Sequence, residues 1–278
     1  QLQSVTLSFS VFAEAGGNPW GSDKLAGGAK WVAVGLAIFT VLFGTRNLDA
    51  NERHHGIVMA IAVEAAVKLL ALIAVGVFVV WGIAGGPMQI LAQIDASPIA
   101  KWEQDGARWF SLIFISAAAF ICLPRMFQVL VVENVDERHL NIAGWAFPAY
   151  LMLMSLFVVP IAVVGLRLLP AGANPDLFVL TVPLSQGQNG LAMLSFLGGL
   201  SSATSMVIVA TIALATMVSN HIVVPIWLTT RSSGEAKVSG DVRYVILLSR
   251  RLSIAGVLLL GYLYYIVSGG GATLAAIG

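Results

Sequence analysis

Six long apolar stretches constrain what this chain can fold into. They lie near 30–45, 57–84, 109–131, 143–169, 190–228 and 244–268. A bilayer core is about 30 Å thick, so a helix needs about 20 mainly apolar residues to cross it. The stretches lack the alternating polarity of barrel strands. With 58% hydrophobic and 10% charged residues, the chain also lies outside the range of soluble domains. The sequence therefore predicts an all-α fold, a polytopic membrane helix bundle.

Basic residues are distributed unevenly over the polar gaps between these stretches. The richer side has eight, namely Arg46, Arg53, Arg138, Arg231, Lys237, Arg243, Arg250 and Arg251, and the other has five, namely Lys24, Lys30, Lys101, Arg108 and Arg167. Loops rich in Lys and Arg stay in the cytoplasm. The bias therefore predicts that the gaps at 46–55, 133–141 and 229–243 are cytoplasmic and that 170–189 is outside.

The sequence offers little support for an enzyme or a nucleic-acid-binding protein. A net charge of +1 gives no basic face for nucleic acid. Cys122 is the single cysteine, and His54, His55, His139 and His221 are scattered without metal-ligand spacing. We find no phosphate-binding loop and no nucleophile elbow. No catalytic residue and no organic cofactor are predicted.

Hydroxyl residues cluster inside the longest apolar stretch, at Ser201, Ser202, Thr204 and Ser205. On a helix, the Ser201 carbonyl and the hydroxyls of Thr204 and Ser205 could face one point. Such oxygens suit a hard monovalent cation such as Na⁺, provided that a second helix completes the shell. The alternative is that these small residues, with Gly198 and Gly199, only allow close helix packing and bond to their own backbone.

Two further polar features fall within apolar stretches. Glu64 and Lys68 lie four residues apart, so they share a helix face as an intramembrane ion pair. One alternative is that the pair relays protons or ions. The other is that it only fixes the packing of the helices. Pro124 and Arg125 interrupt the 109–131 stretch and predict a helix break. That break either exposes backbone groups to a substrate or ion or is an ordinary proline kink near the cytoplasmic end.

Four long segments resemble a known family. They are QLQSVTLSF at 1–9, FGTRNLDANERHHGIVMAIAVEAAVKL at 43–69, LPRMFQVLVVENVDERHL at 123–140 and SSATSMVIVATIALATMVSN at 201–220. Together with the rest of the chain, they are similar to the sodium/solute symporter family of the sodium/proline type. The closest likeness is to the version fused to bacterial sensor histidine kinases.

The resemblance implies that residues 1–278 are part of a LeuT-type inverted-repeat core. The fragment would run from the end of the third core helix to the start of the tenth. The family's sodium ion lies between the first and eighth core helices, and the eighth-helix positions match Ser201, Thr204 and Ser205. The first core helix would lie outside this chain, which starts without Met and ends on an opening helix.

Function is expected to follow from this likeness. We expect sodium-coupled transport or sensing of a small organic solute, an amino acid or carboxylate, by alternating access in a multi-pass protein of the bacterial inner membrane. A fused kinase and its response regulator would be partners, alongside the lipid bilayer. The alternatives are a receptor domain that carries no flux, a plain symporter without a kinase, and a membrane scaffold without a ligand.

Overall fold

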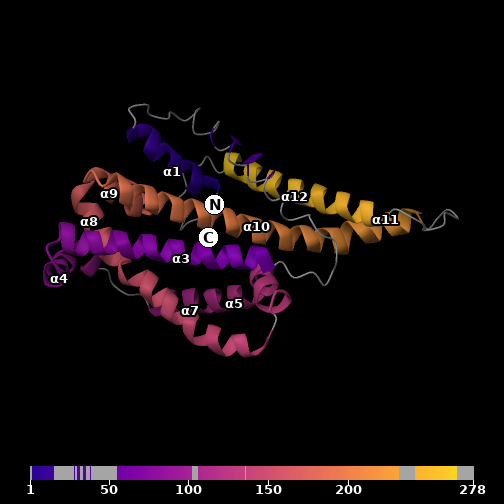
Figure 1. Cartoon of the computed structure of the whole chain (residues 1–278), viewed down its shortest axis with the longest axis horizontal. Coiled ribbons are helices and arrows are strands. Elements are labelled where there is room, and N and C mark those ends of the chain that lie inside the picture. Colours follow the sequence, from indigo (N-terminus) through magenta and orange to yellow (C-terminus); the bar gives the residue numbers. More distant parts are fainter. Residues whose placement is uncertain are drawn as a thin grey trace.

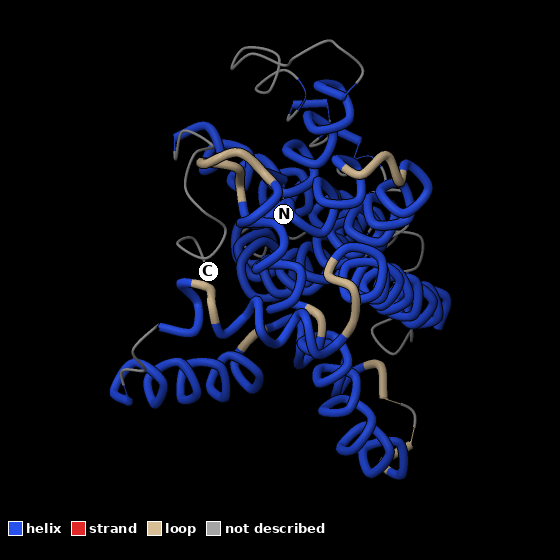
Figure 2. The backbone as a smooth tube through the Cα atoms, turned by 90° about the vertical axis from the view of Figure 1, so that its left-hand side faces the viewer, coloured by secondary structure: helices blue, strands red, loops and turns tan. Residues whose placement is uncertain are grey.

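The computed structural model describes residues 2–15, isolated positions between 28 and 38, and residues 55–101, 106–134, 136–231 and 242–267. Every regular element in these ranges is a helix (Figure 2). Four runs are long and apolar enough to cross a membrane: Val58–Ile83, Arg138–Leu168, Asn189–Trp227 and Leu248–Val267. The predicted all-helical class is thus confirmed over the described ranges, and the chain is compatible with a membrane protein. The predicted 30–45 span lies largely outside them.

Helices α3 (His55–Val77) and α10 (Asn189–Val218) form the centre of the structure. They lie side by side and contact each other more than any other pair of described elements (Figure 1). Helices α1 (Leu2–Ala15) and α12 (Val242–Val267) pack against α10, whereas α7 (Arg138–Leu156) packs against α3. Each central helix therefore has neighbours that cover part of its surface.

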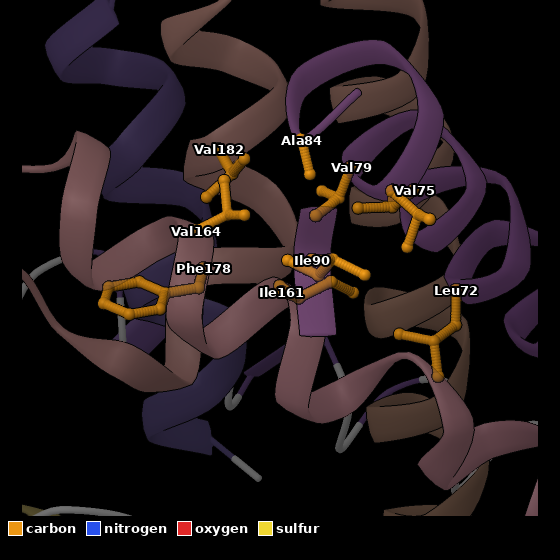
Figure 3. Packing of buried hydrophobic residues seen from close by; sticks show 10 residues of the cluster. Leu72, Val75, Val79, Ala84, Ile90, Ile161, Val164, Phe178 and Val182 are labelled. Carbon is orange, nitrogen blue, oxygen red and sulfur yellow. The ribbon is translucent and has the colours of Figure 1, made fainter. Parts of the chain in front are cut away.

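The principal hydrophobic core lies where α3 continues into the π-helical segment η1 (Phe78–Ile83). Helices α4 (Pro87–Asp95), α8 (Val158–Leu168) and α9 (Phe178–Ser185) pack around this end of α3. Their buried apolar side chains meet in one cluster (Figure 3). Its members are Leu72, Val75, Val79, Val80, Ala84, Ile90, Ile161, Val164, Phe178 and Val182.

Glycines contribute to this core in two ways, by leaving space for aromatic rings and by allowing a sharp turn. A side chain at Gly76 of α3 would collide with the ring of Phe157, and one at Gly165 of α8 would collide with the ring of Phe178. Gly85 and Gly86 have φ angles of 86° and 132°, in a region that L side chains rarely adopt. These two residues turn the chain sharply from η1 into α4, which begins with a proline.

The predicted 109–131 span is divided in the structure. Helix α5 (Gly106–Cys122) ends before Leu123, and a short helix α6 (Pro124–Phe127) and a π-helical segment η3 (Gln128–Val132) follow. The Leu123 N–H still bonds to the carbonyl of Ala119 at 3.0 Å, but Pro124 has no N–H with which to continue. A proline is well suited to the first position of the new helix. The predicted break at Pro124 coincides with this junction.

Short elements connect the rest. They are η2 (Pro98–Lys101), η4 (Pro175–Leu177), η5 (Ser219–Val223) and α11 (Val224–Arg231). Asn174 caps η4, since its side-chain oxygen accepts from the N–H of Asp176 at 3.0 Å. Helix α10 continues through η5 into α11, which produces the single helical run Asn189–Trp227 of 39 residues.

Candidate functional site

Polar side chains from two candidate spans meet between α3 and α10. The Lys68 ammonium of α3 donates a hydrogen bond to the Ser202 hydroxyl of α10 at 3.1 Å. One turn away, the Glu64 side chain is hydrogen-bonded to Ser205. All four side chains are half-buried. We call Glu64, Lys68, Ser202 and Ser205 the polar cluster.

The contacts between α3 and α10 follow an antiparallel register. Glu64 faces Ser205, Lys68 faces Ser202, and Ala71 faces Gly198, so rising numbers on α3 go with falling numbers on α10. A Cβ at Gly198 would lie 3.3 Å from the Cβ of Ala71 and 3.4 Å from the Cα of Lys68. The missing side chain therefore lets the two backbones approach closely. That approach brings the polar groups within reach one and two turns further along.

The predicted pair Glu64 and Lys68 lies on one face of α3, and the two charges interact electrostatically. Each also bonds to a hydroxyl of α10. Lys68 donates to Ser202, and the Glu64 carboxylate accepts from Ser205. Tyr150 of α7 lies near Glu64. Its hydroxyl donates to the Ala65 carbonyl of α3 at 3.3 Å and interacts electrostatically with the Glu64 carboxylate. The pair thus connects α3 with α10, and Tyr150 joins α7 to α3 beside it. Whether the pair also relays an ion stays a prediction.

The predicted sodium ligands lie along one arc of α10. A helix turns about 100° per residue around its axis. Measured around this axis from Ser205, Ser201 lies at about 40° and Thr204 at about 100°, both in the same direction. The Thr204 hydroxyl donates to the Leu200 carbonyl of its own helix at 2.8 Å, as in the packing alternative. Its oxygen keeps lone pairs that can still accept or coordinate. Ser205 stands at the end of the arc nearest Ser202 and belongs to the polar cluster as well.

A second helix supplies the oxygen that a cation beside Ser205 would need. The Glu64 carboxylate of α3 is a hard, anionic donor next to the Ser205 hydroxyl. The Ser201 carbonyl and the Thr204 oxygen belong to positions on α10 turned about 40° and 100° away from Ser205 around the helix axis. Such an all-oxygen set fits a hard cation. The ammonium of Lys68 is the competing positive charge for Glu64.

A cavity of about 200 Å³ adjoins the polar cluster. Lys68 contributes to its wall, together with Ala71 and Leu72 of α3 and Ser195, Phe196 and Gly198 of α10. Ser4 and Ser8 of α1 and Asp176 of η4 also line it. The wall is mostly apolar with a few polar groups, as is usual for sites that bind small molecules.

Comparison of the chain with protein-family models, with curated proteins and with solved structures finds no significant match. Within the described part of the chain, no three His, Cys, Asp or Glu side chains gather as a metal site.

Pro124 and Arg125 form the beginning of helix α6. Their helix α6 packs against α10, and Pro124 is half-buried there. The side chain of Arg125 falls outside the described residues. The two alternatives for this break therefore stay open.

The sequence analysis counted Ser202 among the clustered hydroxyls without making it a ligand, and it did not single out Tyr150. The spacing of Ser202 and Ser205, three residues apart, matches the four-residue spacing of Glu64 and Lys68 on an antiparallel neighbour. The match identifies Ser202 only once α3 is known to pack against α10. Tyr150 shows no such signal, because it reaches the backbone of Ala65 rather than a patterned side chain.

Proposed function

We propose that the chain is the membrane domain of a sodium-coupled system that transports or senses a small organic solute, an amino acid or a carboxylate. One observation carries the proposal: Glu64 and Ser205, on two different spans, bring oxygen atoms together one turn from Lys68, which lines a cavity. Paired charges and hydroxyls inside apolar helices typically mark ion and substrate pathways. The resemblance to sodium/solute symporters supplies the identity of the ion and a LeuT-type architecture.

In this proposal, Na⁺ binds beside Ser205. Ligands would be the Ser205 hydroxyl, the Glu64 carboxylate, the Ser201 carbonyl and the oxygen of Thr204. The bound ion supplies a positive charge that compensates Glu64 while Lys68 is engaged elsewhere. Charge compensation inside an apolar bundle is worth several kcal/mol, which gives the ion a large influence on how α3 and α10 pack.

Alternating access follows if the two arrangements of the bundle bind ion and solute unequally. In one arrangement, α3 and α10 approach closely at Gly198 and Lys68 bonds to Ser202, as in this structure. Separation of the helices would break the bond from Lys68 to Ser202 and open the cavity toward the cluster. Solute and ion together would determine which arrangement prevails.

The system would belong to the inner membrane of a bacterium, where this domain is the input for a fused sensor kinase and its response regulator. That part of the proposal rests on the resemblance to kinase-linked members. A receptor that binds the solute without flux is the second candidate, because the polar cluster needs no open path to both sides in order to signal. A plain symporter is the third.

Uptake by proteoliposomes containing the intact protein tests the proposal. Radiolabelled amino acids and carboxylates are offered with an inward gradient of Na⁺ or, as control, of K⁺. We expect accumulation or saturable binding only with Na⁺, and loss of the Na⁺ effect in Ser205→Ala. Saturable binding without accumulation identifies the receptor, whereas neither binding nor accumulation with any solute rejects the proposal.

A further inference from the structure

Lys68 belongs to two neighbouring environments. Its ammonium donates to Ser202 and acts electrostatically on Glu64, so it is part of the polar cluster. The same residue also lines the cavity formed with α1, η4 and α9. An ammonium carries three donor hydrogens, and the bond to Ser202 uses one of them. The other two remain for further acceptors, including a group that reaches the ammonium from the cavity.

The lining of the cavity narrows the chemistry of its occupant. Lys68 is the basic residue among the described lining residues, and Asp176 is the acidic one. One positive and one negative wall charge favour an occupant with a single carboxylate over a dianion. Leu72, Val179, Leu180 and Phe196 line the remainder and favour an aliphatic body. The volume of about 200 Å³ suits a small molecule.

We propose that Lys68 binds the carboxylate of a small aliphatic molecule in this cavity and that it links this molecule to the cation beside Glu64. The second half of the proposal rests on the proposed sodium-coupled function. A carboxylate at Lys68 compensates its positive charge and draws the ammonium toward the cavity. Glu64 then lacks the nearby positive charge of Lys68, and a cation bound at Glu64 and Ser205 can take the place of that charge. The two ligands therefore strengthen each other's binding, and this coupling is reciprocal.

Binding to the intact protein in lipid nanodiscs tests the carboxylate site. Butyrate and its neutral counterpart butyramide are the probes, with calorimetry as the readout. A charge-assisted hydrogen bond predicts that butyrate binds about tenfold more tightly than butyramide. Lys68→Met should abolish this preference and Lys68→Arg should retain part of it. Arg167→Met, which removes a positive charge from the exposed side of α8, should leave the preference unchanged.

A second measurement needs no variant and so does not depend on the folding of Lys68→Met. Lysine side chains of the unmodified protein are labelled by reductive methylation, and mass spectrometry reports the rate at each site. Butyrate should slow labelling of Lys68, whereas butyramide should not. Equal labelling of Lys68 with both probes, or equal butyrate affinity in Lys68→Met, overturns the carboxylate site.

The link to the cation is tested by titrating Na⁺ with and without butyrate. We expect butyrate to raise the affinity for Na⁺ about fivefold or more in the unmodified protein and not in Lys68→Met. Butyrate binding that depends on Lys68 but leaves Na⁺ affinity unchanged overturns the link. If the protein binds butyrate through Lys68 but no Na⁺ at all, the sodium-coupled function fails while the carboxylate site stands.

Discussion

The side-chain oxygens of Ser219 and Ser249 lie 2.6 Å apart, between η5 at the end of α10 and helix α12. Both residues are almost fully buried, at 0% and 2% exposed. The contact joins two candidate spans by a hydrogen bond between side chains. Such bonds in membrane proteins contribute about 0.6 kcal/mol on average and up to about 1.7 kcal/mol.

Ser219→Ala should therefore lower the stability of the protein by about 1 kcal/mol. The measurement is unfolding in detergent, followed by circular dichroism. Ser155→Ala is the matched control, because the Ser155 hydroxyl is exposed and bonds to the Met152 carbonyl of its own helix. An equal effect of the two substitutions would show that the contact between Ser219 and Ser249 contributes nothing specific.

The charges of Glu64 and Lys68 should be coupled in stability. Glu64→Gln or Lys68→Met leaves one charge without its partner inside an apolar span, whereas the double variant leaves neither. We expect the double variant to be at least about 1 kcal/mol more stable than the sum of the single effects predicts. Unfolding of all four proteins in the same detergent measures this coupling. Additive effects would mean that the two side chains do not compensate each other.

Sodium dependence should distinguish the hydroxyls of α10. Ser205→Ala removes the oxygen beside Glu64 and should raise the Na⁺ concentration for half-maximal binding about fivefold. Thr204→Ala should raise it less, because that hydroxyl already donates to the Leu200 carbonyl. Ser201→Ala keeps the backbone carbonyl and should have no effect. Binding of radioactive Na⁺ gives the three values, and unchanged values for both Ser205→Ala and Thr204→Ala would remove the site assignment.

The close crossing of α3 and α10 should be sensitive to side-chain size at Gly198. Gly198→Val places extra carbon atoms against Ala71 and the backbone of Lys68 and should destabilise the protein by about 1–3 kcal/mol. Gly199→Val is the control, since a Cβ at Gly199 meets nothing within 4 Å. Thermal unfolding compares the two variants. A tolerated valine at Gly198 would show that the helices do not need this close approach.

Much of the fold could be predicted because it depends on local properties. The predicted stretches 57–84, 143–169, 190–228 and 244–268 correspond to the candidate spans Val58–Ile83, Arg138–Leu168, Asn189–Trp227 and Leu248–Val267. Length and apolarity of a single segment are sufficient for this. The division of the 109–131 stretch at Pro124 could be predicted as well, because proline lacks the N–H that would continue the helix.

The candidate site could be predicted only in part. Glu64, Lys68 and Ser205 stand out as polar residues in apolar surroundings, and these three do meet. Which residue pairs with which depends on the register of α3 against α10, a contact between segments more than a hundred residues apart. Helical spacing alone gives no direction for the neighbouring helix, so the contact of Ser202 with Lys68 could not be predicted.

The run from Asn189 to Trp227 contains 39 residues, and at 1.5 Å per residue it is about 58 Å long. A bilayer core is about 30 Å thick, so a rod of this length projects well beyond it. From Ser205 to Trp227 the rod extends about 33 Å. A tilt of about 10° at the height of Ser205 would sweep its far end through about 6 Å. In the proposed sodium-coupled system, a small rearrangement at Ser205 would therefore reach a soluble neighbour as a much larger displacement.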